Sequence, residues 1–245
     1  MKMIRLATVC LLLLSAVACK QKAGNNTGIN ATDTVKKAII KPDSSPKENT
    51  TRQKKDVNAK FLTYNDDGDY YLLLAQHGDS TISFINDDAD RSLNRGDSIK
   101  IFWKDDTITM AGDDEMPVSA KRITSIRKIA DGPVTLFKKS YGRQMKYTWA
   151  PEENFSDYYL DKIYKLVEYY LATTKTELLL RSIKAKEAIN YSLESQERDG
   201  RRYTMIGIAV PGTHGSNIVQ WLYVDDETSQ LFEYDLGNDK LMPVR

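Results

Sequence analysis

The chain has 245 residues, with 35 Lys and Arg side chains against 34 Asp and Glu, so its formal net charge is +1. A balance this even argues against nucleic acid as a partner, because nucleic-acid-binding proteins carry a basic excess that neutralises phosphates. Two cysteines exclude a disulfide framework. The 41% of hydrophobic and 28% of charged residues fit a soluble globular protein and exclude a multi-span membrane protein.

The first eighteen residues have the pattern of an export signal. Lys2 and Arg5 precede an apolar run over residues 6–17, which is too short to cross a bilayer comfortably. The run leads into Ala18 and Cys19, and small residues directly before a cysteine resemble the lipobox of bacterial lipoproteins. In that family the signal peptide is cut before the cysteine, whose sulfur then receives a diacylglyceryl group.

The resemblance implies a mature protein that is held at a membrane by acyl chains of the palmitate kind on Cys19. Two acyl chains give stable anchoring, since each buried methylene contributes about 0.8 kcal/mol. Cleavage also removes Cys10 and leaves Cys19 with no partner inside the chain, which favours acylation over a free thiol. Ala16 stands where the commonest lipobox has Leu, so an ordinary secretory signal cut after Ala18 stays open.

Residues 19–58 are predicted to be a disordered tether. Residues 19–56 carry nine Lys or Arg against four Asp or Glu, and few apolar side chains offset the entropy cost of ordering them. The residues after Cys19 are Lys20, Gln21 and Lys22, without the acidic run that directs some lipoproteins of this kind to the cell exterior. We therefore expect a cell-envelope location facing the periplasm, at the inner or the outer membrane.

Residues 59–132 are predicted to form a small antiparallel β-barrel or sandwich. Short alternating runs separated by turn residues predict this class. Arg95, Gly96 and Asp97 spell an integrin-binding tripeptide, but Gly and Asp before a strand are ordinary turn residues. The predicted strands are residues 70–75, 81–85, 99–103, 108–110 and 123–129.

Residues 133–245 are predicted to form an α+β domain, a helical layer against an antiparallel meander. Ser156 is the expected N-cap of the main helix, and apolar residues at spacings of three and four follow it to Leu171. A shorter helix is expected over 176–185, and Asp199 with Gly200 predicts a hairpin turn. The predicted strands are residues 134–137, 146–149, 189–193, 203–210, 218–224, 231–234 and 240–244.

This arrangement is similar in outline to cystatin-like and NTF2-like folds. The segments 221–225 and 231–234 also resemble the closing hairpins of envelope lipoproteins of Bacteroides. That resemblance implies no activity.

No catalytic or metal-binding template is satisfied. Neither His77 nor His214 lies near a nucleophile elbow, and a zinc site needs three or four ligands that the sequence does not gather. A calcium loop starting at Asn86 has Arg91 where glycine is required. The acidic clusters are typical of solvated turns. We therefore expect a protein that is not an enzyme, with no metal and no cofactor.

Aromatic side chains are the remaining candidates for binding. Tyr158 and Tyr169 fall outside the apolar stripe of the main helix, and Trp221 falls in a predicted strand. We therefore expect a non-catalytic, lipid-anchored envelope protein that binds a protein partner or a glycan. The alternatives are a carboxylate-dependent glycan hydrolase and an inhibitor of cell-wall lytic enzymes. The carboxylates that the hydrolase would use are Asp87, Asp88, Asp225 and Asp226.

Overall fold

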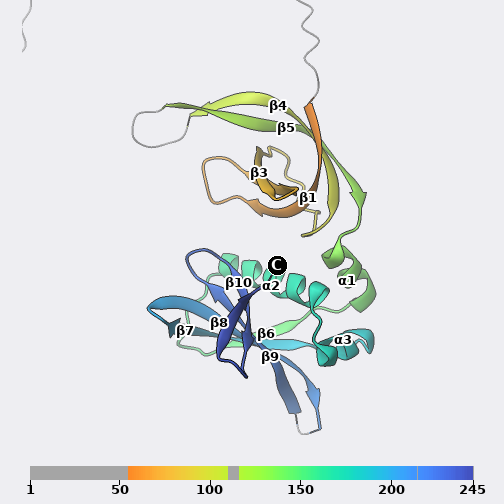
Figure 1. The fold of residues 1–245 in the computed structure, drawn as a ribbon, viewed down its shortest axis with the longest axis vertical. Coiled ribbons are helices and arrows are strands. Elements are labelled where there is room, and N and C mark those ends of the chain that lie inside the picture. Colours follow the sequence, from red (N-terminus) through yellow and green to blue (C-terminus); the bar gives the residue numbers. More distant parts are fainter. Residues whose placement is uncertain (1–54, 110–115, 214, 245) are drawn as a thin grey trace, which may run out of the picture. The chain divides into compact units, whose positions relative to one another are not determined.

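The protein is described by a computed structural model over residues 55–109, 116–213 and 215–244 (Figure 1). The chain is α+β, as the sequence predicts. Its first five strands close into a barrel in the order β1-β2-β3-β5-β4, which is the strand order of an OB-like barrel. The strands are β1 (Lys55–Asn65), β2 (Leu72–His77), β3 (Ser80–Ile85), β4 (Ser98–Thr109) and β5 (Pro117–Ala130).

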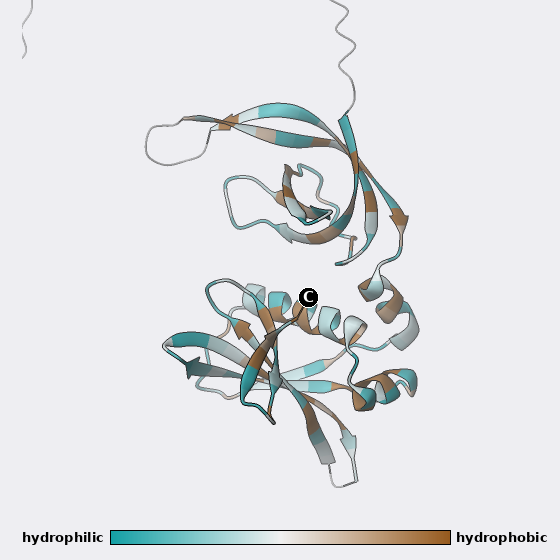
Figure 2. Cartoon of the chain, in the orientation of Figure 1, coloured by the Kyte–Doolittle hydropathy of each residue, from teal (hydrophilic) through white to brown (hydrophobic). Residues whose placement is uncertain are grey.

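The barrel is closed by pairings that join distant parts of the chain. β1 pairs antiparallel with both β2 and β4, while β3 meets β5 through one parallel bridge, Ile85 with Arg122. Hydrophobic and hydrophilic residues alternate along these strands (Figure 2). The inward positions form a compact core of Ala59, Phe61, Leu73, Ala75, Phe84, Ile99 and Ile101.

The predicted tether is four residues too long, because β1 begins at Lys55 rather than after Asn58. Residues 55–58 pair with residues 100–103 of β4. Val57 is the only apolar residue among these four, so their own sequence carries no alternating pattern that identifies a strand. The backbone hydrogen bonds to β4 hold this segment in the sheet.

A buried aspartate joins the barrel to the helix that follows it. Asp97 is fully buried, and its carboxylate accepts hydrogen bonds from the Gly132 N–H and the Thr135 hydroxyl, both at 2.7 Å. It also accepts from the Asn94 N–H and pairs with the Lys128 ammonium, both at 2.9 Å. This carboxylate is committed to internal contacts, so the Arg-Gly-Asp tripeptide is not an adhesive site.

The remainder of the described chain contains three helices and a six-stranded sheet. The sheet has the order β11-β10-β9-β8-β7-β6 and is mixed, since β6 runs parallel to β7 while every other pair is antiparallel. The predicted meander is thus antiparallel from β7 onward only. The helices are α1 (Pro133–Tyr141), α2 (Asp157–Thr173) and α3 (Glu177–Lys184), and the strands are β6 (Lys146–Trp149), β7 (Asn190–Arg198), β8 (Arg201–Gly212), β9 (Gly215–Asp225), β10 (Leu231–Asp235) and β11 (Lys240–Pro243).

The predicted strand over residues 134–137 is wrong, because these residues lie in α1. Pro133 occupies the first turn of that helix, where its missing N–H costs nothing. Gly142 ends the helix in the left-handed conformation, at φ 65°, and donates its N–H to the Lys138 carbonyl. The proline and the glycine that bound this segment favour a helix, although the short apolar run between them predicts a strand.

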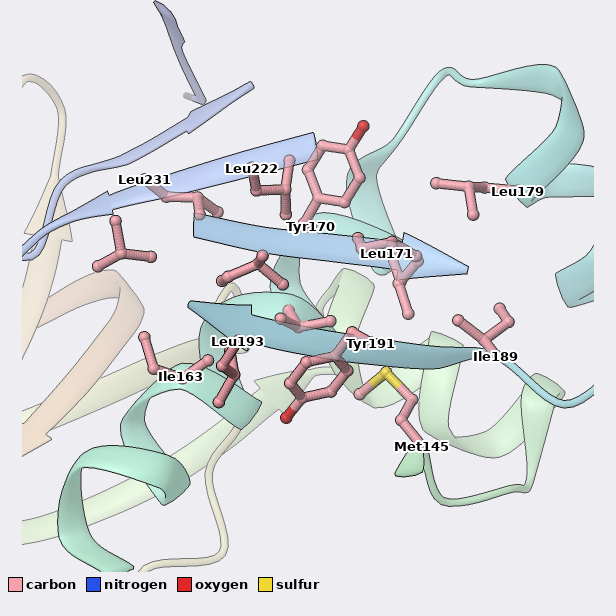
Figure 3. Packing of buried hydrophobic residues seen from close by; sticks show 14 of the residues in the cluster. Met145, Ile163, Tyr170, Leu171, Leu179, Ile189, Tyr191, Leu193, Leu222 and Leu231 are labelled. Carbon is pink, nitrogen blue, oxygen red and sulfur yellow. The ribbon is translucent and has the colours of Figure 1, made fainter. Parts of the chain in front are cut away.

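The main helix follows the sequence prediction closely. The Ser156 hydroxyl caps α2 by accepting a hydrogen bond from the Tyr159 N–H. Ile163, Tyr170 and Leu171 of α2 point toward the sheet (Figure 3). Their strand partners in this core include Tyr191, Leu193, Ile206, Leu222 and Leu231. None of the helices in the described part of the chain is both long and apolar enough to span a membrane.

Candidate functional site

The helices cover one face of the sheet, and aromatic side chains gather on the other. Alternate residues of a strand point to opposite faces, and residues paired across strands share a face. Met205 pairs with Tyr223, which pairs with Phe232, so these three lie opposite the face that carries the core residues Ile206 and Leu222. We call this surface the aromatic face, and it comprises Tyr203, Met205, Trp221, Tyr223, Phe232 and Tyr234.

The rings of the aromatic face hold one another in place. The ring of Tyr203 meets those of Tyr223 and Phe232 nearly edge-on, with centroids 5.9 and 6.3 Å apart. The ring of Tyr223 lies 5.5 Å from that of Tyr234, and its hydroxyl donates to the Met205 sulfur at 3.1 Å. Tilted and edge-on pairs are favourable arrangements for aromatic rings. Within this cluster Tyr203 and Tyr223 are buried, whereas Phe232 and Tyr234 stay partly exposed.

Trp221 lies directly against the backbone of Gly207. A Cβ atom added at Gly207 would lie 2.8 and 3.1 Å from two atoms of the indole, and 3.0 Å from the Ser192 hydroxyl oxygen. Any side chain at this position would therefore push the indole aside. The indole is half-buried and borders the surface.

A row of polar side chains borders the aromatic face along β7. Ser192, Glu194, Gln196 and Arg198 alternate along this strand and share the face of Gly207, Met205 and Tyr203 through their pairing with β8. We call these four residues the polar row. The Gln196 amide donates to the Glu194 carboxylate at 2.9 Å.

Arg198 connects the polar row to the far side of the aromatic face. Its guanidinium lies 5.5 Å from the centroid of the Tyr234 ring and donates to the Asp239 carboxylate at 2.8 Å. The Tyr234 hydroxyl donates to the same Asp239 oxygen at 2.8 Å. The hydrogen bond to Asp239 raises the pKa of Arg198, and the same bond holds the pKa of Asp239 below its usual value. Both charges therefore persist at neutral pH.

The structure separates the three aromatic residues that the sequence singles out. Trp221 belongs to the aromatic face, but Tyr158 and Tyr169 lie on α2. The Tyr158 hydroxyl donates to the Asp67 carboxylate at 2.7 Å, and this bond raises the pKa of Tyr158 to about 12. The Arg95 guanidinium lies 4.0 Å from the centroid of the Tyr169 ring. Both tyrosines thus contact residues of the barrel segment.

The other four rings of the aromatic face were not predicted from the sequence. Tyr203 alternates with Met205 on β8, Trp221 with Tyr223 on β9, and Phe232 with Tyr234 on β10, so the signal in the sequence is a period of two along three neighbouring strands. That signal does not say which face of the sheet the helices cover. The register between β8, β9 and β10 supplies the missing information.

The four carboxylates named for a hydrolase are engaged in local contacts. Asp87 pairs with the Arg122 guanidinium at 2.5 Å, and Asp88 accepts from the Asp90 N–H. Asp225 is buried and accepts from the N–H groups of residues 227 and 228 in the turn after β9. Asp226 accepts from the hydroxyls of residues 159 and 204.

No group of three or more His, Cys, Asp or Glu side chains suited to a metal occurs among residues 55–109, 116–213 and 215–244. Cys19, the acidic run 113–115 and His214 lie outside these described residues.

Comparisons with known proteins identify no family for this chain. No family model and no curated protein matches it. Among solved structures, an aspartyl-tRNA synthetase from Entamoeba histolytica is similar over 66% of this chain and 49% of its own, at 7% identity and a TM-score of 0.25. An asparaginyl-tRNA synthetase from Pyrococcus horikoshii is similar over 64% and 48%, at 11% identity and a TM-score of 0.22. The chain thus spans about half the length of these synthetases, and the likeness carries no functional conclusion.

Proposed function

We propose that this protein is a non-catalytic, lipid-anchored component of the bacterial cell envelope that binds a glycan through the aromatic face and the polar row. The observation that supports glycan binding most directly is the indole of Trp221, which lies on Gly207 beside Ser192. An aromatic ring of this kind offers a face for the C–H groups of a sugar.

The polar row supplies the complementary chemistry. Hydroxyl, carboxylate, amide and guanidinium groups stand at successive outward positions of β7, about 7 Å apart for alternate residues of a strand. A sugar stacked on Trp221 would place its hydroxyls toward Ser192 and Glu194. A sugar ring is apolar on its faces and carries hydroxyl groups at its edge. Hydrogen-bond donors and acceptors beside the apolar indole therefore suit a sugar.

The anchor is a separate part of the proposal and is supported by the lipobox-like residues 16–19. Acylation of Cys19 would keep the protein at a membrane, on its periplasmic side. A partner protein is the second candidate ligand for the aromatic face, since Trp, Tyr and Arg are the residues that dominate the energetics of protein interfaces.

A glycan array followed by titration calorimetry on the purified full chain tests the binding proposal. We expect Trp221→Ala to weaken binding of the best glycan by about 1–2 kcal/mol, a factor of roughly 5–30. The matched control is Trp149→Ala, because Trp149 is an exposed tryptophan on β6, outside the aromatic face. Equal losses in the two variants would contradict the proposal. An array with no binder, together with Trp221-dependent capture of an envelope protein, would favour the partner protein.

A further inference from the structure

A tyrosine hydroxyl is buried without a partner in the core between α2 and the sheet. Tyr191 lies on β7, is 2% exposed and pairs in register with the core residue Ile208, so its ring is on the helix side of the sheet. Figure 3 shows the hydroxyl at the end of the ring that points away from β7. No residue in the described part of the chain forms a hydrogen bond with it. A buried hydroxyl that stays unpaired destabilises a fold, so this group needs a partner.

Two more tyrosines and a glutamate lie next to this hydroxyl. The ring of Tyr147 stacks on that of Tyr191 with centroids 5.3 Å apart, and the ring of Tyr164 meets that of Tyr147 edge-on at 6.3 Å. Tyr164 belongs to α2, and Glu168 follows it one turn later on the same face of the helix. Burial first, and then the ionisable groups of Tyr147, Tyr164 and Glu168, raise the pKa of Tyr191. The phenol therefore keeps its proton and can donate a hydrogen bond.

The glutamate can accept from a further donor. Glu168 is 6% exposed, and its carboxylate oxygen Oε2 lies 3.0 Å from the Lys138 ammonium. Among the residues that the structure describes, Lys138 is the only hydrogen-bond partner of this carboxylate. Burial raises the pKa of Glu168, although the Lys138 ammonium opposes this effect. A carboxylate accepts hydrogen bonds at two oxygens, so one ammonium leaves this buried group incompletely satisfied.

Tyr191 and Glu168 are thus a donor and an acceptor that lie near each other without a direct bond. Glu168 is close enough to raise the pKa of Tyr191, yet its carboxylate forms no hydrogen bond with the hydroxyl. Water is the usual partner of buried polar groups that the chain itself leaves unpaired, and it needs at least two polar neighbours. These two side chains provide a donor for the water oxygen and an acceptor for one of its hydrogens.

Lys138 connects Glu168 to the barrel segment. Its ammonium also donates to the Asn94 amide oxygen at 3.0 Å. The Asn94 amide nitrogen donates to the Thr135 hydroxyl at 3.0 Å, and that hydroxyl donates to the buried Asp97 carboxylate. Hydrogen bonds and the ion pair therefore form a continuous chain from Asp97 to Glu168, and this chain ends one contact short of the sheet.

We propose that one ordered water molecule is bound in the core between the Tyr191 hydroxyl and the Glu168 carboxylate. Tyr191 donates to the water oxygen, and the water donates to Glu168. The water thereby joins β7 to the polar chain that runs through α2 and α1 to Asp97. The site is on the helix side of the sheet and is independent of the aromatic face, so either proposal can fail alone.

A high-resolution crystal structure of the full chain tests the site directly. We expect electron density for a water molecule at about 2.6–3.2 Å from both the Tyr191 hydroxyl and a carboxylate oxygen of Glu168. A direct hydrogen bond between the two side chains would overturn the proposal, and so would a Tyr191 hydroxyl with no density beside it.

The stability of Tyr191→Phe provides a second test, because a paired and an unpaired hydroxyl predict opposite signs. The substitution keeps the ring and removes only the hydroxyl. Loss of a hydroxyl that bonds to water should raise the unfolding equilibrium constant, measured in urea at pH 7, about tenfold. Loss of an unpaired buried hydroxyl would lower this constant. A lower or an unchanged constant would contradict the bound water.

A double-mutant cycle identifies Glu168 as the acceptor. We expect the effect of Tyr191→Phe on the unfolding constant to be smaller by about threefold or more when Glu168→Met is already present. The matched control is Tyr147→Phe, since Tyr147 is a half-buried tyrosine that stacks on Tyr191. Its effect should be the same with and without Glu168→Met. Equal effects of Tyr191→Phe in the two backgrounds would overturn the link to Glu168.

Discussion

Single residues decide the shape of the aromatic face. Only glycine at position 207 leaves room for the indole of Trp221. The backbone of Gly207 does not adopt a left-handed conformation, so glycine is required there for space and not for its backbone freedom. The indole atoms in question are at the far end of the side chain, so they can move without displacing the backbone. A substitution at Gly207 therefore changes the aromatic face more than the fold.

We predict that Gly207→Ala tilts the indole and weakens glycan binding severalfold, by about 1 kcal/mol. Tryptophan fluorescence should shift, while the far-ultraviolet circular dichroism spectrum stays that of the parent protein. Gly68→Ala is the matched control, since a Cβ at Gly68 meets nothing within 4 Å. Unchanged affinity in Gly207→Ala would show that the position of the indole does not matter.

Asp97 is the residue on which we expect stability to depend most. Burial raises its pKa, but hydrogen bonds from Asn94, Gly132 and Thr135 and the Lys128 ammonium outweigh burial and hold the pKa of Asp97 below its usual value. We predict that Asp97→Asn lowers the free energy of unfolding at pH 7 by about 2–4 kcal/mol, the cost of charge-assisted bonds to a buried carboxylate. Urea unfolding measures this loss. Asp105→Asn, which removes an exposed ion pair with Lys55, should cost less than about 1 kcal/mol.

The same carboxylate predicts a dependence of stability on pH. Because its pKa is lower in the folded than in the unfolded chain, acid protonates the unfolded state first. The stabilisation is complete well above the unfolded pKa of about 3.9 and is lost as the pH falls through and below that value. Unfolding measured at pH 7 and in steps down to about pH 3 should therefore show a steeper loss in the parent than in Asp97→Asn. Parallel curves would contradict this role for Asp97.

At the scale of elements, local end signals determine the helices. Ser156 accepts the Tyr159 N–H at the start of α2, whereas Thr176 accepts no capping bond at the start of α3. We predict that Ser156→Ala destabilises the protein by about 1 kcal/mol and that Thr176→Ala costs less. The midpoints of urea unfolding, compared at an unchanged dependence of the unfolding free energy on urea concentration, measure the two losses. A larger loss in Thr176→Ala would mean that its contact with Tyr170 outweighs capping.

The elements that the sequence predicts correctly are those with local signals. Ser156 and the stripe ending at Leu171 identify α2, and Asp199 with Gly200 forms the β7–β8 turn, both with positive φ. The strand predicted over 134–137 fails because Pro133 and Gly142, the true end signals, flank a run too short to show helical period. Barrel closure through Ile85 and Arg122 depends on residues far apart in sequence, and no local pattern reveals it.

The candidate site was only partly accessible to prediction for the same reason. Trp221 was identified as an aromatic residue in a strand, but its companions depend on the register of three strands. Tyr158 and Tyr169 are not part of the core cluster on which α2 packs. Their contacts with Asp67 and Arg95 come from tertiary structure, which a helical projection does not contain.

At the scale of the whole molecule, the proposed acylation of Cys19 would determine where the protein acts. We predict that globomycin causes the unprocessed precursor to accumulate, and that Cys19→Ser moves the protein from the membrane fraction to the soluble fraction. Loss of both acyl chains should eliminate nearly all of the membrane affinity, because the methylene groups of the acyl chains provide that affinity. Fractionation followed by mass spectrometry of the N-terminal peptide checks both outcomes. Normal maturation under globomycin would rule out the lipoprotein.

The two edge strands of the six-stranded sheet, β6 and β11, have only four residues each. β11 also contains Pro243, which has no N–H to donate, and Lys residues begin both strands. If the proposed anchor holds the copies at one membrane, they meet far more often than copies in free solution. Edge strands that are short, begin with lysine or contain proline leave a neighbouring copy few backbone groups to pair with. Crowding should therefore not drive these molecules into intermolecular sheets.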